Sequence, residues 1–410
     1  VPSVRMRALM EPALRAVSAW RAAGGEVLAY TGGALPAADL VVDALFGIGL
    51  DRAPQGSAAA AIAAINAQSA PVFALDVPSG LNADSGYAPG ACVQASATLT
   101  FVAWKRGLWT GVAAKVCGEP QLATLEVAVE AFAGTDADAE LLGLSQLRTA
   151  LAPRARDLHK GGCGHVLVIG GDHGHGGAVL LAARAAARTG AGLVSVATRA
   201  QQVAPILASI PEAMVHAVAS SEDLRGLIDR ADVIALGPGL GQSDWGLQLA
   251  AEACASGRPM VLDADALNLL AAGRIAAPAH CVLTPHPGEA ARLLGVDVAA
   301  IAQDRYAAVR ELARRFRAIV VLKGAGSLIA DHGGAVAVCP FGNPGMAAGG
   351  MGDALTGVIA ALIAQGLGLV DAARAGVTVH ALAGDRAAGN GERGLLATDL
   401  IAELRMLVNP

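Results

Sequence analysis

A glycine-rich segment that ends in a carboxylate is the part of the sequence best suited to handling an anionic group. It covers residues 342–353, and the apolar stretch 354–364 follows at once, without the Gly-Lys-Ser/Thr of a Walker P-loop. Glycines lack a Cβ, so backbone amides there can approach an anion, and a helix starting there would add its positive dipole. Asp353 would then be placed as a general base on a substrate hydroxyl. A lone Asp at this position more often only caps the helix, but the preceding glycines favour phosphate chemistry.

A lysine at the end of an expected strand is the second candidate. Lys323 is followed by a short turn made of Gly324, Ala325, Gly326 and Ser327. Such positions in open α/β sheets commonly face ligands. The lysine could meet a nucleotide phosphate as a point charge, with Ser327 and backbone amides assisting. An equally good alternative is a strand-edge lysine followed by a hairpin into residues 335–339.

Two further strand ends carry polar side chains. His286 lies between two prolines, which fix the direction of its imidazole, and Glu289 follows, so we expect a substrate-side role rather than a purely structural one. Asp263 and Asp265 follow another expected strand. They either hold Mg²⁺ through water or cap the next helix, and we favour capping with some role in shaping the site.

Glycine turns follow two more expected strands, at residues 170–178 and 237–241. Neither matches G-x-G-x-x-G in a βαβ setting, so no dinucleotide fingerprint is indicated. Each turn is weak by itself. Five loops at strand ends together indicate one site at the carboxyl edge of a parallel sheet.

Near the N-terminus, Asp43 and Asp76 each end an expected strand beside a glycine or serine turn. Carboxylate, hydroxyl and carbonyl oxygens of this kind suit a hard cation and could receive a sugar or phosphate. Two ordinary strand-to-loop turns are an equally good explanation.

The elements that must position these residues are alternating strands and helices. Short apolar runs ending in Gly, Pro or Asp recur between Ala-rich segments, which predicts parallel α/β sheets. The expected strands are 40–46, 71–77, 97–104, 165–169, 193–197, 232–236, 260–263, 281–284, 319–323 and 335–339. The chain starts in a helix-like segment, 4–23. The acidic, Ala-rich passage 118–153 is predicted to connect a domain at 1–140 to one at 145–410.

Composition narrows the class of protein. The 410 residues suffice for two or three domains, and with 54% hydrophobic but only 3% aromatic residues the core must be Ala, Val, Leu and Ile. A net charge of -5 without a dense Lys/Arg run indicates neither nucleic acid nor a membrane as partner. The six cysteines form no C-x-x-C pair, so we expect reduced core residues. No secretory signal or membrane span is recognisable, and we expect a cytoplasmic protein.

Seven motifs in the second part, taken together, resemble the NAD(P)H-hydrate dehydratase family from about Arg148 to Pro410. They are residues 159–161 (His-Lys-Gly), 170–173 (Gly-Gly-Asp-His), 237–241 (Gly-Pro-Gly-Leu-Gly), 263–270 (Asp-Ala-Asp-Ala-Leu-Asn-Leu-Leu), 284–290 (Thr-Pro-His-Pro-Gly-Glu-Ala), 322–326 (Leu-Lys-Gly-Ala-Gly) and 349–353 (Gly-Gly-Met-Gly-Asp). The first part resembles NAD(P)H-hydrate epimerase through residues 42–50 and 76–80. The whole chain thus resembles the bifunctional repair enzymes of nicotinamide nucleotides. This implies an α/β protein with a ribokinase-like C-terminal domain and an incomplete Rossmann-like epimerase domain.

The resemblance implies dehydration of the S epimer of hydrated NADH or NADPH at the expense of ADP, with ATP as the eukaryotic counterpart. Asp353 would deprotonate the ring hydroxyl, which accepts a phosphoryl group and is then eliminated as phosphate, while residues 349–352 stabilise the moving charge. The residues implied to contact the hydrate are Ala178, Gly239, Gly241, His286 and Asp353. Those implied to hold ADP, whose phosphates Mg²⁺ would bridge, are Lys323, Gly324, Ala325, Gly326, Ser327 and Gly352.

For the first domain the resemblance implies K⁺ at Asp43 and Ser79, with the hydrate held by Gly47, Gly49 and Asp76. The sequence departs from the family here, because the Asn-Asn-Gly-Gly-Asp loop that the epimerase pattern requires has no counterpart before Val41. We therefore expect epimerase activity to be lost or to depend on residues outside this sequence.

Two alternatives remain open. The same fold would serve a ribokinase-superfamily kinase for a vitamin precursor or a sugar, although the epimerase-like half argues against this. A non-enzymatic nucleotide-binding scaffold that oligomerises through the first domain is the other. We expect a homo-oligomer from the resemblance alone.

Overall fold

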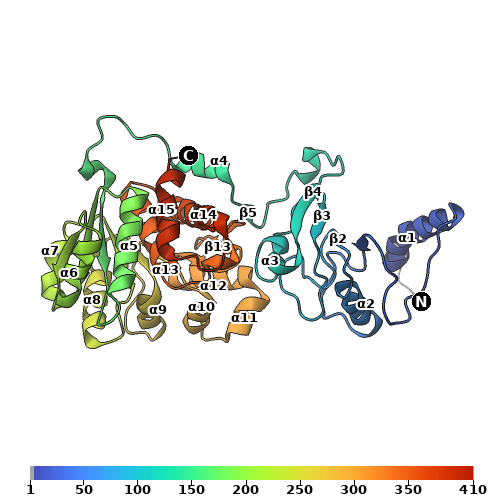
Figure 1. Ribbon diagram of the computed structural model, residues 1–410, viewed down its shortest axis with the longest axis horizontal. Helices are drawn as coiled ribbons and strands as arrows, with labels where there is room; N and C mark the ends of the chain where they lie inside the picture. Colours follow the sequence, from blue (N-terminus) through green and yellow to red (C-terminus); the bar gives the residue numbers. More distant parts are fainter. Residues whose placement is uncertain (1–3, 410) are drawn as a thin grey trace.

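The computed structural model describes residues 4–409, which form a large C-terminal unit and a smaller N-terminal unit side by side (Figure 1). Each unit has its own sheet, of ten and four strands respectively. The α/β class predicted from the sequence is confirmed. Among the described residues, no helix is long and apolar enough to cross a membrane.

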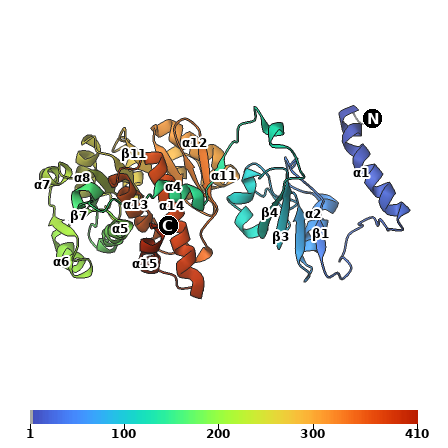
Figure 2. The same cartoon turned by 90° about the horizontal axis from the view of Figure 1, so that it is seen from above.

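The N-terminal unit is built on four parallel strands in sequence order. They are β1 (Val41–Asp43), β2 (Val72–Leu75), β3 (Ala97–Phe101) and β4 (Glu119–Ala123). Its helices are α1 (Val4–Ala22), α2 (Gly56–Asn66), α3 (Ala113–Val116) and the 3-10 turns η1 (Arg106–Trp109) and η2 (Val129–Phe132). Seen from above, α1 lies at the end of the molecule farthest from the large sheet (Figure 2).

The C-terminal sheet has the order β5-β14-β13-β12-β11-β10-β9-β6-β7-β8, in which only β13 runs antiparallel to its neighbours. The strands are β5 (Glu140–Leu141), β6 (His165–Ile169), β7 (Leu193–Thr198), β8 (Met214–Ala217), β9 (Val233–Leu236), β10 (Met260–Leu262), β11 (Cys281–Leu283), β12 (Ile319–Leu322), β13 (Ser327–Ala330) and β14 (Val336–Cys339). The chain leaves β6 toward β7 and β8 on one side and then returns to β9 on the other. The chain therefore reverses direction across the sheet between β6 and β9, which is where open α/β sheets bind ligands.

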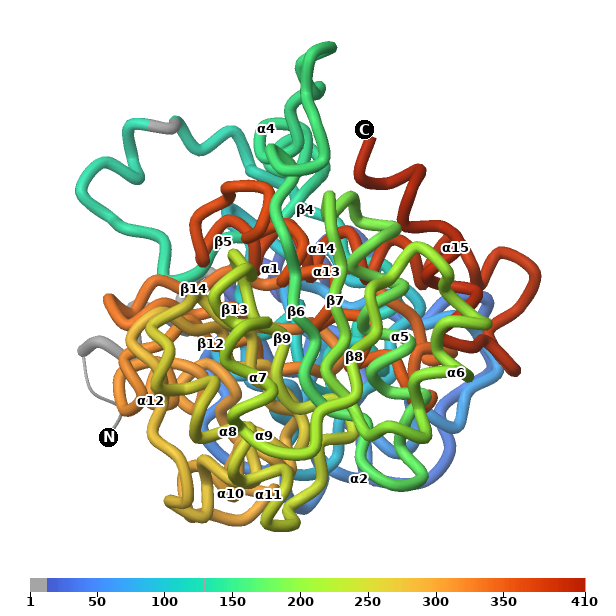
Figure 3. The backbone as a smooth tube through the Cα atoms, turned by 90° about the vertical axis from the view of Figure 1, so that its left-hand side faces the viewer, coloured from blue at the N-terminus to red at the C-terminus, as the bar shows by residue number. Residues whose placement is uncertain are grey.

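Helices cover both faces of this sheet (Figure 3). One face packs against α4 (Leu144–Ala150), α5 (Gly176–Thr189), α6 (Ala200–Ser209), α13 (Met351–Ala364), α14 (Leu369–Ala387) and α15 (Ala397–Leu407). The other packs against α7 (Ser221–Ile228), α8 (Asp244–Ala255), α9 (Ala264–Ala271), α10 (Pro287–Leu294), α11 (Val298–Gln303) and α12 (Arg305–Phe316). Three short turns, η3 (Lys160–Cys163), η4 (Pro344–Met346) and η5 (Ala388–Asn390), complete the unit.

The small side chains of the sequence allow two helices of this layer to touch. A Cβ on Gly357 of α13 would collide with the carbonyl oxygen of Ala182 in α5. Only glycine permits this approach, because any larger residue would push the helices apart. The contact fixes the position of α13, whose first turn carries Asp353.

The strands that sequence reasoning missed are mostly at sheet edges. β4, β5 and β8 are edge strands, and β4 carries a proline and exposed polar residues, so none shows the continuous apolar run of a buried strand. β13 is interior, and the sequence indicated it only through the alternative of a hairpin into residues 335–339, which the antiparallel pairing of β13 with β14 confirms. Since β4 belongs to the small sheet and β5 to the large one, the passage predicted as a connection, 118–153, contains elements of both.

Candidate functional site

The five predicted loops meet along one edge of the large sheet. Strands β12, β11, β10, β9 and β6 are parallel neighbours in that order, so their carboxyl ends lie in one row. The glycine-rich segment 342–353 follows β14, which runs parallel to β12, so it lies at the same edge and leads into α13. Residues from six separate parts of the sequence therefore meet in one candidate site at the carboxyl edge of the sheet.

A buried ion pair between Lys323 and Asp263 lies where these loops meet. Lys323 Nζ lies 2.7 Å from Asp263 Oδ1, and Asp263 is only 2% exposed. Burial alone would raise the pKa of Asp263, but the charge and hydrogen bond of Lys323 hold it below the usual value. Burial alone would lower the pKa of Lys323, but Asp263 and Glu289 raise it instead. Both groups are therefore charged at neutral pH.

Helix α13 is bonded to that pair. Thr356 Oγ1 donates to Asp263 Oδ2 at 3.0 Å, and a Cβ on Gly352 would lie 3.2 Å from Lys323 Nζ. His380 of α14 contacts the first turn of α13. Its Nε2 lies 2.9 Å from the Met351 carbonyl oxygen. Burial lowers the pKa of His380 to about 4, so the ring is neutral and Nε2 can donate.

Asp353 is not used as a helix cap. The N-cap is Gly350 in a left-handed conformation (φ 88°), and among residues 4–409 no hydrogen bond reaches the Asp353 carboxylate. Burial and the charge of Asp263 raise its pKa to about 6, although Lys323 opposes the shift. A partly buried carboxylate with a raised pKa and no structural partner has the properties of a general base.

The two glycine turns at the strand switch pack on each other. A Cβ on Gly239 would lie 2.7 Å from that of His175 and 3.2 Å from that of Ala178. Gly241 N donates to Asp265 Oδ2 at 2.8 Å. The structure therefore brings together Ala178, Gly239 and Gly241, which the resemblance had placed at the hydrate.

Asp172 stabilises these turns through residues that sequence reasoning missed. Arg199 Nε donates to Asp172 Oδ1 at 2.8 Å and Ser243 Oγ to Oδ2 at 3.1 Å. Burial would raise the pKa of Asp172, but the hydrogen bond from Arg199 and the other donors lower it. Arg199 also lies over the Trp245 ring, 4.2 Å from its centre. The only signal in the sequence for Arg199 and Ser243 is that each lies between a strand and the helix that follows it.

His286 has a structural role, as the N-cap of α10. Its Nδ1 accepts from the backbone of Gly288 at 2.9 Å and of Glu289 at 3.4 Å, so it caps α10. Burial, with Lys323 and Arg292 nearby, lowers its pKa, and the ring is neutral. Its Nε2 lies 3.5 Å from Glu289 Oε1, and with half of the side chain exposed the ring is still accessible to a ligand. A substrate contact at His286 therefore stays a prediction.

In the N-terminal unit, Asp43 and Ser79 are bonded to each other. Ser79 donates to Asp43 from its amide at 2.7 Å and from Oγ at 2.6 Å, and both residues are 1% exposed. Asp43 forms no ion pair within the described residues, and the donors to its carboxylate are the neutral amides of Leu45 and Ser79 and the Ser79 hydroxyl. Oxygen ligands around an uncompensated carboxylate suit a hard monovalent or divalent cation. Two side chains supply only part of such a coordination shell.

Asp76 lies beside the turn that contains Gly47. Its Oδ2 is 3.5 Å from where a Cβ on Gly47 would be, whereas Gly49 has open space around it. Lys105 Nζ pairs with Asp76 Oδ1 at 2.7 Å, and Thr100 Oγ1 donates to the same oxygen at 3.2 Å. Asp76 has a positive φ of 71°, an unusual backbone conformation that sequence reasoning did not predict.

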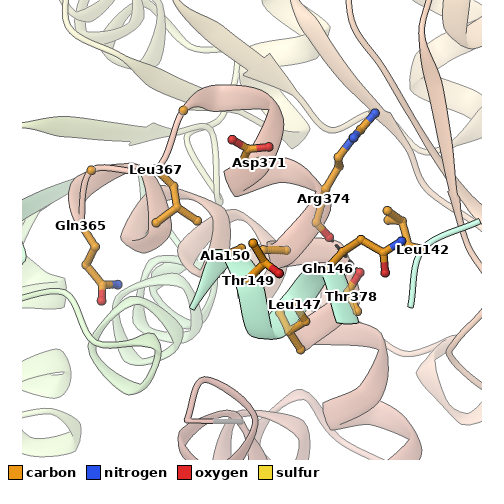
Figure 4. Close-up of a pocket in the computed structure, with 13 residues that line it drawn as sticks. Leu142, Gln146, Leu147, Thr149, Ala150, Gln365, Leu367, Asp371, Arg374 and Thr378 are labelled. Carbon is orange, nitrogen blue, oxygen red and sulfur yellow. Dashed lines mark hydrogen bonds between the residues drawn. The ribbon is translucent and has the colours of Figure 1, made fainter. Parts of the chain in front are cut away.

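A separate cavity lies away from all these residues. A cavity of about 540 Å³ lies between α4 and the start of α14, at the far end of α13, and Asp371, Arg374 and Thr378 of α14 are among the residues that line it (Figure 4). No residue that the sequence singled out for chemistry lines it.

Comparison with known proteins assigns both units. The family model for NAD(P)H-hydrate dehydratase matches residues 166–406, and that for the YjeF-related protein N-terminus matches residues 4–107. A bifunctional NAD(P)H-hydrate repair enzyme of Coxiella burnetii is 49% identical over 399 residues, covering 97% of this chain and 82% of its own length. The Escherichia coli enzyme of the same name is 45% identical, covering 98% and 78%.

Solved structures match the C-terminal unit. The ADP/ATP-dependent NAD(P)H-hydrate dehydratase of Bacillus subtilis, co-crystallised with ATP and Mg²⁺, aligns with a TM-score of 0.59 at 29% identity, covering 66% of this chain and 97% of that one. A ribokinase-like superfamily protein of Enterococcus faecalis aligns with a TM-score of 0.62 at 30% identity, covering 66% and 96%.

Proposed function

The chain belongs to the bifunctional NAD(P)H-hydrate repair enzymes, and we propose that Asp353 is the base with which it dehydrates the S epimer of hydrated NADH or NADPH at the expense of ADP. One observation carries this assignment. Asp353, with a pKa raised to about 6 and no hydrogen bond from its own helix, stands at the start of α13 beside the Lys323–Asp263 pair. A kinase for vitamin precursors or sugars is disfavoured by the family membership.

The proposed reaction has two steps. Asp353 takes the proton of the ring hydroxyl, and the oxygen attacks the terminal phosphorus of ADP, forming an O–P bond as the bond to AMP breaks. The phosphorylated ring then loses inorganic phosphate together with a proton from the neighbouring carbon, which restores the ring double bond. Amides of residues 349–352 lie at a helix N-terminus and would stabilise the charge on the moving phosphoryl group.

The nucleotide is assigned to the end of β12. Lys323 would meet the phosphates, and the backbone of Gly324, Ala325, Gly326 and Ser327, together with Gly352, would hold the rest of ADP. Gly352 lies against Lys323 Nζ, which supports a common role for the two segments. The B. subtilis relative was crystallised with ATP, so ATP is the natural second nucleotide to try.

Mg²⁺ is expected with the nucleotide. Within the described residues no group of three or more His, Cys, Asp or Glu side chains is arranged to hold a metal ion. Mg²⁺ commonly takes most of its ligands from phosphates and water and only one or two carboxylates from protein. Bound there, it would neutralise phosphate charge, while Asp263 and Glu289 are the nearest protein carboxylates to Lys323.

The hydrate is assigned to the neighbouring loops. Ala178, Gly239, Gly241 and His286 would contact it, in reach of the same helix that carries Asp353. The close packing of Gly239 on Ala178 supports this assignment, because it brings the two segments together.

Turnover of the full chain tests the function. Purified protein with hydrated NADH, ADP and Mg²⁺ should restore the near-ultraviolet absorbance of the dihydronicotinamide ring and release AMP and phosphate. Accumulation of a stable phosphorylated alcohol without NADH would favour a simple kinase instead. Nucleotide binding without turnover of any hydrate would favour a scaffold.

The N-terminal unit is assigned a cation and a second hydrate position. K⁺ would be held by Asp43 and Ser79, which the buried, unpaired carboxylate supports, and the hydrate by Gly47, Gly49 and Asp76. Enzyme-accelerated conversion of the R epimer by this chain would support a working epimerase site, and persistence of the R epimer would contradict it. A homo-oligomer and a cytoplasmic location also stay predictions.

A further inference from the structure

The N-terminal unit touches the nucleotide segment of the C-terminal unit directly. Thr110 Oγ1 donates to the Gly326 carbonyl oxygen at 2.8 Å, and Gly111 N donates to that of Ala325 at 3.2 Å. A Cβ on Gly326 would collide with the carbonyl oxygen of Trp109. The two backbones are therefore as close as glycine permits.

A buried arginine completes this contact. Arg305, the first residue of α12, is 5% exposed, and its Nε donates to Thr110 Oγ1 at 2.9 Å. Its Nη2 donates to the carbonyl oxygens of Leu322 and Lys323, both at 3.2 Å. One guanidinium therefore ties the end of β12 to the N-terminal unit, and the Thr110 hydroxyl is shared between Arg305 and Gly326.

The charge of Arg305 is not neutralised locally. It forms no ion pair with a carboxylate in the part of the chain that the structure describes, and its contacts are neutral oxygens. Burial lowers its pKa only to about 10, so it stays a cation at neutral pH. Such a charge directly behind the 324–326 turn favours an anion on the other side of that turn.

Tyr306, the residue after Arg305, makes a second contact between the two units. Tyr306, fully buried, donates its hydroxyl to the Arg106 carbonyl oxygen at 2.9 Å, and the Arg106 guanidinium lies over its ring, 4.8 Å from the centre. The start of α12 therefore contacts both ends of segment 106–111, through Tyr306 at Arg106 and through Arg305 at Thr110. The contact is specific, because it combines oriented hydrogen bonds with backbone packing.

We propose that Thr110 and Arg305 are positioning residues through which the N-terminal unit holds the 324–326 turn in the shape that binds ADP. This rests on the proposed assignment of ADP to residues 323–327. The turn contains two glycines and is partly exposed, and glycine backbone can adopt many conformations unless other contacts restrict it. Holding it in advance lowers the ordering entropy that ADP binding would otherwise lose. The effect should appear in the KM for ADP and not in the chemical step.

Three variants of the full chain test this. Thr110→Val removes the hydroxyl but keeps the shape, and Thr110→Ser restores the hydroxyl. Thr98→Val is the matched control, because Thr98 is equally buried in the same unit and donates to the Cys117 carbonyl oxygen, away from the contact. We expect Thr110→Val to raise the KM for ADP about fivefold or more, the effect of one hydrogen bond, with kcat within about twofold. Thr110→Ser and Thr98→Val should keep the wild-type KM.

The outcomes separate the two proposals. If wild type regenerates NADH with ADP but Thr110→Val and Thr98→Val have the same KM for ADP, only the positioning role is overturned. If wild type does not turn over at all, the proposed function fails and the positioning role fails with it. If Thr110→Val does not fold, Tyr306→Phe, which removes only the hydroxyl donated to Arg106, is judged by the same rule.

Discussion

Lys323 Nζ lies 2.7 Å from Asp263 Oδ1, and this contact joins the ends of β12 and β10 across the intervening strand β11. Thr356 of α13 donates to the other oxygen of the same carboxylate. Since Thr356 follows Asp353 by three residues, both lie on one face of the helix. The ion pair therefore sets the position of the proposed base as well as that of the proposed phosphate ligand.

Breaking the ion pair should damage both stability and nucleotide binding. Lys323→Met leaves Asp263 buried without a cation, so we expect the free energy of unfolding to fall by about 3–5 kcal/mol. The KM for ADP should rise at least about tenfold through loss of a phosphate contact. Chemical denaturation and steady-state kinetics measure the two effects.

The double variant Asp263→Asn with Lys323→Met is the companion test. Removing both charges should recover part of the stability lost in Lys323→Met, because no buried charge is left unpaired. Thr356→Val, which removes one neutral donor, should lose only about 1 kcal/mol. Equal losses of unfolding free energy for Lys323→Met and Thr356→Val would show that the ion pair contributes no more to stability than one neutral hydrogen bond.

Removing the base should abolish turnover without harming the fold. We expect Asp353→Asn to lower kcat by about 10²–10⁴, the usual contribution of a general base, while ADP still binds. Asp371→Asn is the matched control, because Asp371 is likewise the third residue of its helix but lies at the far end of α13. Wild-type turnover in Asp353→Asn would refute the proposed mechanism.

The raised pKa of Asp353, about 6, predicts an acid limb in the activity. As a base it must be ionised, so kcat/KM should fall about tenfold per pH unit below that value. A plot of kcat/KM against pH checks this. A flat profile down to pH 5 would show that another group is the base.

The same shift has a consequence for stability. Between the ordinary value of 3.8 and about 6 the folded protein keeps a proton that the unfolded chain has lost, so this group lowers stability progressively as pH rises through that window. Asp353→Asn removes the effect. Near pH 7 the variant should be more stable than wild type, by on the order of 1–3 kcal/mol, and the gain should shrink by pH 5. A gain that grows toward acid pH would contradict the assignment.

His286 allows a substrate contact to be separated from a helix cap. His286→Ala loses the acceptor that caps α10, and we expect a loss of about 1 kcal/mol in unfolding free energy. His286→Asn keeps an acceptor for the backbone amides and should restore stability. If His286 also contacts the hydrate, His286→Asn should still show a raised KM for the hydrate at a normal KM for ADP. Wild-type kinetics in His286→Asn would leave only the capping role.

Part of this architecture was readable from local pattern. The strand at 165–169 was predicted with the bounds of β6, because a buried parallel strand is a continuous apolar run closed by glycine. The segments around Lys323 and Asp353 were recognisable for a similar reason, since glycines beside a charged residue at a strand end or helix start are local features. Edge strands such as β4 lack that pattern and were missed.

What the sequence by itself determined is therefore which residues can do chemistry: Asp353 behind its glycines, Lys323 before its turn, and the motifs that place the chain in its family. Only the tertiary structure decided which of them act together. The bond between Arg305 and Thr110 spans 195 positions and that between Thr356 and Asp263 spans 93, and no local periodicity reports contacts of that range. They arise because sheet order and the close packing of α13 on α5 bring those segments together, and burial then fixes which groups are charged.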